Sequence, residues 1–287
     1  MSSLPHFQRM VIIGVGLIGG SLALVCREKG IVSEVIGVGR SEENLKDAIS
    51  LKVIDSYTFS IEDAVKGADI IILATPVRSL TRLAGEMSPY LSSGAIVTDV
   101  GSVKGPVVKI EDIIPPDTHF VGAHPIAAKE RSGVKEASTG LFEGARCILT
   151  PTSKTDYNAI SAVQSIWEAA GAHVIHMTPD RHDLIFAAVS HLPHVVAYAL
   201  VNTLLDLEAT DEGVISYSAG GFRDFTRIAA SHPEMWRDIC LMNRENIISM
   251  LERYEDTIGR LKSLIQSEDA DGLYREFDRA RQVREKL

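Results

Sequence analysis

The segment IIGVGLIGGS, near the N-terminus, most constrains the fold that this 287-residue chain can adopt. It places Gly14, Gly16 and Gly19 directly after a strand-like apolar run and at the start of a helical stretch. Glycines at this spacing allow a tight turn, a close approach of the backbone to a pyrophosphate, and close packing of helix on strand. The helix N-terminus, which here includes Leu17 and Ile18, adds the positive end of its dipole. The segment predicts a dinucleotide site; the alternative is a glycine-rich turn that binds nothing.

Strand-like and helix-like stretches alternate through the first half of the chain. The strand-like runs are residues 9–16, 34–39, 69–76, 95–102, 119–125 and 146–151. The helical stretches are residues 17–30, 41–51 and 79–91, and a further helix and strand lie within 155–177. Runs that are apolar throughout are typical of strands buried on both faces, and the alternation with helices indicates crossover connections. The first half therefore predicts an α/β fold with a parallel, doubly wound sheet.

The pattern changes after Met177, beyond which no convincing strand is found. The expected helices cover residues 182–207, 222–230, 233–267 and 269–286, with Thr178 or Asp180 capping the first of them. We expect a Rossmann-type dinucleotide-binding domain at 1–177 and an all-helical domain at 178–287, with the boundary somewhere in 150–180. Helical domains rich in Leu, Ile and Val often pair with a copy of themselves, which favours a homodimer through this domain.

Composition narrows the functional classes. Hydrophobic residues make up 45% and charged residues 23%, as in soluble globular proteins. The net charge of −9 argues against a nucleic-acid partner. Cys26, Cys147 and Cys240 form no CxxC pair, so neither a zinc site nor a disulfide framework is expected. No signal peptide and no apolar run of transmembrane length is recognised. We expect a cytoplasmic protein without a membrane partner.

The end of the second predicted strand bears on the choice of cofactor. Enzymes that use NAD usually carry an acidic residue there, which holds the ribose hydroxyls. This chain has Gly39 at that position, followed by Arg40 and Ser41. A cation and a hydroxyl without a carboxylate suit the 2′-phosphate of NADP. The alternative is that Arg40 is a solvated surface residue and that the enzyme uses NAD.

Three strand ends carry candidate reacting groups. Ligands of open α/β sheets lie beyond the carboxyl ends of the strands. Thr75 and Pro76 follow one strand and could border the cofactor, Ser102 follows another, and His124 ends a third. Hydride transfer from a carbinol needs a base for the hydroxyl proton, and imidazole has a suitable pKa. We therefore favour a catalytic His124 over a purely structural histidine.

The helical half contributes a second group of candidates. His194 lies three residues after His191, so the two lie near one face of a helix. Arg223 and Arg227 share a face of a segment that is otherwise largely apolar, with Asp224 three residues before Arg227. The Asp224 and Arg227 spacing could form an exposed ion pair of little consequence. Cations on an apolar segment favour an anionic ligand instead.

Motifs in both halves match one family. GVGLIGGS, DVGSVK, GAHPIA, SHLPH and GGFRDFTRIA, followed by MWRDI and Asn243, resemble the prephenate/arogenate dehydrogenases of tyrosine biosynthesis, in that order and at that spacing. The resemblance implies a Rossmann-type domain, a helical dimerisation domain and an active site between them. It also implies oxidative decarboxylation of prephenate or arogenate: hydride leaves C4 of the ring for the nicotinamide, the 4-hydroxyl becomes a carbonyl, and CO2 departs without a metal.

The resemblance also implies a role for each candidate. His124 accepts the proton of the 4-hydroxyl, and Ser102 hydrogen-bonds to that hydroxyl and orients His124. Arg227 holds a substrate carboxylate, and His194 helps to hold the substrate. Asp224 and Trp236 organise the side of the active site at which the substrate binds. Arg223 is a further substrate-binding candidate, at a position where some members of the family have Lys.

One departure and two alternatives remain. Many members read His-Pro-Met-Ala-Gly, whereas this chain has Ala128 in place of the glycine, so the loop conformation could differ. A β-hydroxyacid-type dehydrogenase would rely on a lysine in the helical domain, where this chain has mainly arginines. A non-catalytic NADP sensor would not need Ser102 with His124. The motifs do not separate prephenate from arogenate, although we favour prephenate.

Overall fold

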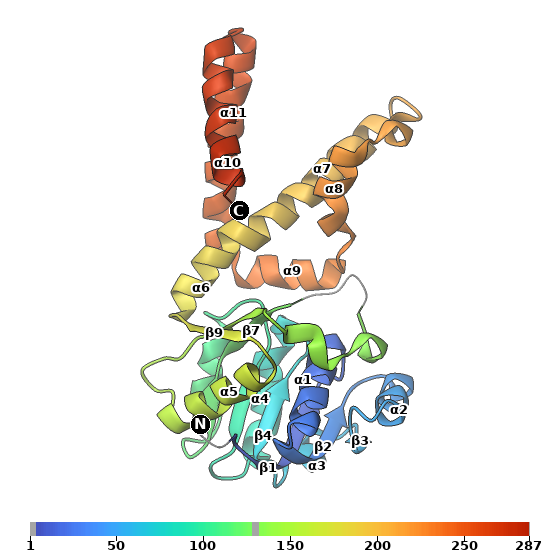
Figure 1. The fold of residues 1–287 in the computed structure, drawn as a ribbon, viewed down its shortest axis with the longest axis vertical. Coiled ribbons are helices and arrows are strands. Elements are labelled where there is room, and N and C mark those ends of the chain that lie inside the picture. Colours follow the sequence, from blue (N-terminus) through green and yellow to red (C-terminus); the bar gives the residue numbers. More distant parts are fainter. Residues whose placement is uncertain (1–3, 128–131, 287) are drawn as a thin grey trace.

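The computed structural model describes residues 4–127 and 132–286. Figure 1 shows an α/β domain from which helices of the second half of the chain project as two separate arms. The expected order, a Rossmann-type domain followed by a helical one, is confirmed.

The large sheet lies at the centre of the first domain. Its strands are β1 (Phe7–Ile13), β2 (Val32–Val38), β3 (Ser56–Thr58), β4 (Ile70–Leu73), β5 (Ile96–Asp99) and β6 (His119–Val121). They run parallel in the order β3-β2-β1-β4-β5-β6. The associated helices are α1 (Leu17–Glu28), α2 (Glu42–Ser50), α3 (Ile61–Val65), α4 (Leu80–Met87) and α5 (Tyr157–Ala169). Apolar clusters cover both faces of the sheet, as the continuous apolar runs predicted.

A second, smaller sheet corrects the expectation of a purely parallel fold. It consists of β7 (Ala123–Ile126), β8 (Arg146–Leu149) and β9 (His173–His176), and β7 pairs with β8 in the antiparallel sense. Residues 119–125, expected as one strand, are divided at Gly122. A Cβ at Gly122 would lie 2.5 Å from Thr150 Oγ1, so the chain leaves the large sheet at a residue where a larger side chain would require Thr150 to move. The short β3 and α3 were not foreseen.

The helical domain begins where the strands end. Its helices are α6 (Pro179–Phe186), α7 (Leu192–Glu208), α8 (Gly220–Thr226), α9 (Pro233–Met242), α10 (Arg244–Gln266) and α11 (Ala270–Arg284), with a π-helical turn (Ala187–His191) joining α6 to α7. The Thr178 hydroxyl accepts a hydrogen bond from the backbone N–H of Arg181, so Thr178 is the cap. The single helix expected at 233–267 is wrong, because Asn243 interrupts it and donates its side-chain amide to the carbonyl of Asp183.

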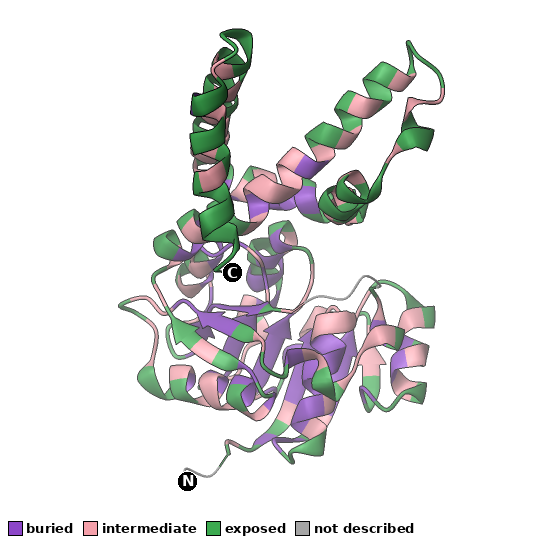
Figure 2. Ribbon diagram, turned by 45° about the horizontal axis from the view of Figure 1, so that its top comes forward, coloured by how far each residue is buried: buried purple, intermediate pink, exposed green. Residues whose placement is uncertain are grey.

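Long faces of the helical domain are exposed in the single chain. Figure 2 shows the α7 and α10–α11 arms largely in the colours of intermediate and exposed residues. Only Ala197 is buried along α7, and exposed apolar side chains include Leu200, Leu205 and Leu207. Residues Pro179–Glu208 are apolar and long enough to cross a membrane by length and composition alone, contrary to the sequence-based expectation. However, this stretch begins with the buried polar residues His182 and Asp183, which contact the first domain. An apolar face exposed in this way fits the expected pairing with a second copy.

A buried polar cluster joins the two domains. Lys104 and Asp99 form a fully buried ion pair, and Lys104 Nζ also donates to the carbonyl of Ala123 at 2.7 Å. The Asp183 carboxylate of α6 accepts the backbone N–H groups of Lys104 and Gly105, both at 2.8 Å. The loop after β5 is thereby attached to β7 and to the helical domain.

Removing Lys104 should therefore be costly. In Lys104→Ala the carboxylate of Asp99 stays buried without its cation, and breaking a buried pair in this way typically costs about 3–5 kcal/mol. The matched control is Lys154→Ala, which removes an ion pair to Asp112 whose side chains are 64% and 63% exposed; such pairs contribute about 0–1 kcal/mol. Urea unfolding of both variants measures the difference, and equal losses would contradict the structural role given to Lys104.

Candidate active site

The glycine loop has the shape of a dinucleotide cradle. Gly14 has a φ of +99°, and a Cβ there would lie 2.5 Å from the carbonyl oxygen of Ala74. A Cβ at Gly19 would lie 2.8 Å from the carbonyl oxygen of Gly14, so helix and strand are close at that point. At Gly16, in contrast, a Cβ would meet no atom within 4 Å. The loop is packed at its two ends and open at its centre, where the backbone can approach a phosphate.

The N-terminus of α1 completes this cradle. The helix begins at Leu17 without a side-chain cap and without an acidic residue in its first turn. The N–H groups of Leu17, Ile18 and Gly19 therefore lie where a helix has no acceptors of its own and where its dipole favours an anion. Thr75 borders the same loop, since its methyl group would lie 2.9 Å from a Cβ at Gly14, and Pro76 follows it. These residues fit a pyrophosphate, which supports the predicted dinucleotide site.

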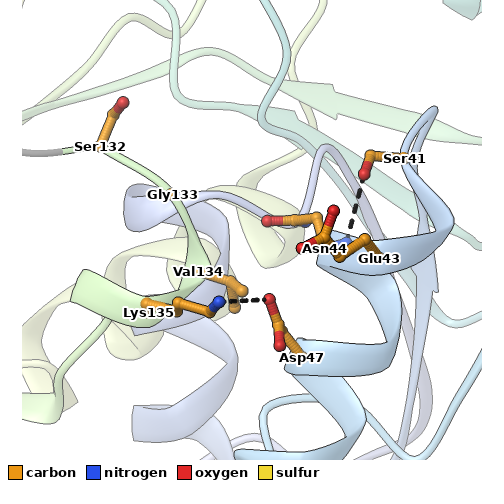
Figure 3. A pocket seen from close by; sticks show the side chains of 8 residues that line it. All are labelled: Ser41, Glu43, Asn44, Asp47, Ser132, Gly133, Val134 and Lys135. Carbon is orange, nitrogen blue, oxygen red and sulfur yellow. Dashed lines mark hydrogen bonds and ion pairs between the residues drawn. The ribbon is translucent and has the colours of Figure 1, made fainter.

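The end of β2 opens beside a small cavity. This cavity has a volume of about 230 Å³ and is lined by Ser41, Glu43, Asn44, Asp47, Ser132, Gly133, Val134 and Lys135. Figure 3 shows the Ser41 hydroxyl directed at the backbone N–H of Asn44, which it caps at 3.2 Å, and Lys135 directed at Asp47, at 3.0 Å. Arg40 is exposed. The hydroxyl of Ser41 accepts in this cap and can still donate its own proton to a ligand, while the adjacent Arg40 does not line the cavity.

His124 is buried at the start of β7 and faces the helical domain. Its Nδ1 lies 2.8 Å from Nε2 of His182, and Nδ1 of His182 lies 2.8 Å from a carboxylate oxygen of Asp183. Burial holds the pKa of His124 well below its usual value, and the charges of His182, Lys104 and His191 lower it further. His124 is therefore neutral near pH 7 and can accept a proton.

Ser102 lies in the loop that Asp99 organises. Asp99 accepts the backbone N–H of Gly101 at 2.8 Å and that of Ala123 at 3.2 Å, so one carboxylate holds both the Ser102 loop and the start of β7. In residues 4–127 and 132–286, no hydrogen bond joins Ser102 to His124. The partner of His124 Nδ1 in the structure is His182, and the role expected for Ser102 stays a prediction.

His194 and Trp236 form one stacked unit in the helical domain. Their ring centroids are 3.7 Å apart at an angle of 20°, and Trp236 is buried. His194 Nδ1 lies 2.8 Å from the carbonyl oxygen of Ser190, to which it donates, so Nε2 is the nitrogen that can accept. Burial lowers the pKa of His194. The neighbouring His191 is buried against Asn243, and burial lowers its pKa to about 4.

The charged segment on α8 is exposed, in contrast to Trp236. Arg223, Asp224 and Arg227 are exposed on α8 and the turn that follows it, and this segment contains no buried residue. The expected role of Arg227 in binding an anionic ligand stays a prediction. The segment packs against α7. Ala128 lies outside the described residues.

Sequence reasoning missed the polar residues that surround His124. His182, Asp183 and Asn243 were given no role, yet all three are buried and hydrogen-bonded in one cluster with Lys104. The available signal was the adjacent His-Asp pair one turn after the capping Thr178. Only the burial of these side chains shows that they act together.

Two alanine substitutions in the glycine loop should separate packing from binding. Gly14→Ala should lower the free energy of unfolding by at least about 2 kcal/mol, since a left-handed backbone strains an L residue by about 1–3 kcal/mol and its Cβ would overlap Ala74. Gly16→Ala should leave stability within about 0.5 kcal/mol but weaken dinucleotide binding about tenfold or more by blocking phosphate contacts. Urea unfolding and calorimetric titration with NAD+ and NADP+ test both. Equal effects of the two variants on stability would contradict this division.

The comparisons with known families agree with this geometry. Residues 22–176 match the family model "Prephenate dehydrogenase, nucleotide-binding domain", and residues 178–279 match "Prephenate dehydrogenase, dimerization domain". The first match begins after the glycine loop, so the glycine assignments rest on the structure.

Whole-length relatives show the same similarity. The chain is 38% identical to a prephenate dehydrogenase of Bacillus subtilis over 97% of this chain and 76% of that protein. It is 36% identical to a cyclohexadienyl dehydrogenase of Zymomonas mobilis over 97% and 95%. A crystal structure of Aquifex aeolicus prephenate dehydrogenase in complex with hydroxyphenyl propionate and NAD+ superposes with a TM-score of 0.91 at 41% identity, covering 97% and 98% of the two chains. Synechocystis arogenate dehydrogenase gives 0.81 at 29% identity, covering 97% and 99%. The chain belongs to the prephenate dehydrogenase family.

Proposed function

We propose that this protein catalyses the oxidative decarboxylation of prephenate to 4-hydroxyphenylpyruvate, with NADP+ as the hydride acceptor, in tyrosine biosynthesis. The observation that carries the proposal is the buried, neutral His124, held by His182 on the side of its Nδ1. Family membership supports a dehydrogenase rather than a non-catalytic sensor or a β-hydroxyacid-type enzyme.

The chemistry follows from the position of His124. When bound, the nicotinamide accepts a hydride from the ring carbon that carries the hydroxyl. Nε2 of His124 takes the proton of that hydroxyl, which becomes a carbonyl, and Ser102 donates a hydrogen bond to the same oxygen. Loss of CO2 follows because it makes the ring aromatic: the electron pair of the broken C–C bond moves through the ring to the carbonyl oxygen, which takes up a proton and becomes the phenol hydroxyl. The residues around His124 exclude water and keep its pKa low, so the base is unprotonated when substrate arrives.

The helical domain supplies the groups that hold the substrate. Arg227 binds a substrate carboxylate through a bidentate contact, which suits its planar guanidinium, and Arg223 adds a second cation on α8. His194 offers Nε2 toward the substrate, while Trp236 fixes the plane of the His194 ring by stacking. Asp224 belongs to the same wall, where it limits the net positive charge.

A second candidate substrate is arogenate, which differs from prephenate only in an amino group on the side chain. The structural similarity to Synechocystis arogenate dehydrogenase supports it. Measuring kcat/KM for both substrates with both nucleotides decides between the four combinations. A higher kcat/KM for arogenate would overturn our assignment of prephenate.

The helical domain is also the proposed dimer interface. The exposed apolar residues of α7 need a cover, and the matching family model is described as a dimerization domain. We place the active form as a soluble homodimer in the cytoplasm.

His124→Asn should lower kcat by about a hundredfold or more, the usual contribution of a general base. Asparagine keeps a polar side chain in the same place but cannot take the proton. Binding of nucleotide and substrate should change much less. Steady-state assays at 340 nm give both quantities, and His176→Asn, at an exposed histidine of β9, is the control. A variant with near-normal kcat would show that His124 is not the base.

The nucleotide preference should depend on Arg40. A charge-assisted hydrogen bond to the 2′-phosphate contributes about 1.5–3 kcal/mol, or roughly tenfold to a hundredfold in affinity. Arg40→Gln should therefore lower kcat/KM for NADP+ while leaving that for NAD+ nearly unchanged. Gly39→Asp should reverse the preference, and its Cβ needs only a small shift of Leu45, which lies 3.3 Å away.

The control for this cofactor test is Arg82→Gln, at an exposed arginine of α4 that pairs with Glu86. Both nucleotides are compared at saturating prephenate and at two salt concentrations, since salt weakens a phosphate contact at the surface. A wild-type preference for NAD+ would mean that Arg40 does not bind the 2′-phosphate.

A further inference from the structure

Three buried side chains form a line from β7 into the helical domain. His124 Nδ1 is 2.8 Å from His182 Nε2, and His182 Nδ1 is 2.8 Å from Asp183 Oδ1. His182 is fully buried, and the Phe186 ring lies 4.5 Å from its ring and 4.8 Å from that of His124. The first histidine belongs to the nucleotide-binding domain and the other two residues to α6.

The hydrogen bonds determine where the protons lie. Asp183 already accepts the backbone N–H groups of Lys104 and Gly105, so its oxygens are acceptors. His182 must therefore donate from Nδ1, and in the neutral ring its Nε2 is then an acceptor. His124 must in turn donate from Nδ1. Its Nε2 is left with a free lone pair, which is the form that a base needs.

We propose that His182 and Asp183 are positioning residues that hold His124 in the tautomer protonated at Nδ1 and stabilise its imidazolium during the reaction. The second part rests on the proposed function. When the substrate O–H bond breaks and a new N–H bond forms at His124 Nε2, the ring becomes a cation. Its Nδ1–H still donates to His182, whose own Nδ1–H donates to the anionic Asp183. The positive charge is thereby connected to a carboxylate through two hydrogen bonds.

The other groups around His124 make such a connection necessary. Lys104, from the loop after β5, and His191, from the π-helical turn, oppose a positive charge on His124, as does any positive charge on His182 itself. Burial lowers the pKa of His182, so it is a neutral His182 ring that accepts from His124. Phe186, from α6, contributes no charge, and the Cys147 thiol of the opposite strand is neutral because burial raises its pKa. Asp99 is bound to Lys104. Asp183 is therefore the anion that reaches His124 by hydrogen bonds, and it does so across the domain boundary.

The first experiment measures the tautomer directly. Long-range ¹H–¹⁵N NMR of the histidine-labelled protein reports which ring nitrogen carries the proton, and the His124 signals are identified by their absence in His124→Asn. We expect a protonated Nδ1 and an unprotonated Nε2 in the wild type, and loss of this single tautomer in His182→Leu. A wild-type His124 protonated at Nε2, or an unchanged tautomer in His182→Leu, would overturn the proposal. Neither reading requires catalysis, so a failure of the proposed function stays distinguishable.

The second experiment separates positioning from simple structural support. His182→Leu should lower kcat about a hundredfold or more, because His124 loses its acceptor. His182→Gln keeps a carbonyl oxygen that can accept from Nδ1–H and should recover at least about tenfold of that loss, with KM nearly unchanged in both variants. In His182→Gln, the imidazolium of His124 lacks the connection to Asp183. The acid limb of the kcat/KM profile should therefore move to lower pH.

The control is His176→Leu, at an exposed histidine outside the site. A merely structural role for His182 predicts the opposite pattern, in which Gln is no better than Leu and the acid limb does not move. If His182→Leu fails to fold, the wild-type tautomer and the Gln variant still decide.

Discussion

The buried ion pair between Lys104 and Asp99 is the constraint on which the arrangement of the site depends. A buried pair of this kind adds little net stability, because the loss of hydration offsets most of the attraction. Its contribution is positional. Asp99 holds the Ser102 loop and the N–H of Ala123, while Lys104 binds the carbonyl of Ala123 and gives its own N–H to Asp183. The Lys104–Asp99 ion pair thus connects β5, β7 and the helical domain through hydrogen bonds.

The helix that carries His182 is adapted to this arrangement by its π-helical turn. His182 and Phe186 are four residues apart, and His191 follows after five, which is the spacing of one π turn. His182 and Phe186 contact His124 of the first domain, whereas His191 contacts Asn243 and Trp236 of the helical domain. Pro193 lies in the first turn of α7, two residues after His191. It has no backbone N–H to donate to the carbonyl of Val189, so the helix must change its hydrogen bonding there. Asn243 donates to the carbonyl of Asp183 in the same region.

The sequence predicted the parts of the molecule that depend on local pattern. The glycine spacing, the apolar strands and a cap at Thr178 or Asp180 are all recognisable from neighbouring residues, and the structure confirms the α/β domain and the helical domain that follows it. The antiparallel β7 was missed because it depends on pairing between residues far apart in sequence, such as His124 with Ile148. The hydrogen bonds of His182 were missed for a related reason. A histidine on a helix shows its partner only when burial and distance are known.

The two sides of the site are held in different ways. The proposed base, His124, lies in a buried network within one chain. The wall that carries Arg223 and Arg227 has no buried residue, and it packs on α7, where only Ala197 is buried. Few buried contacts mean low local stability. The position of Arg223 and Arg227 therefore depends on the packing of α7 more than the position of His124 does. Under the proposed function, assembly through the helical domain would act on substrate binding and leave the proposed proton acceptor in place.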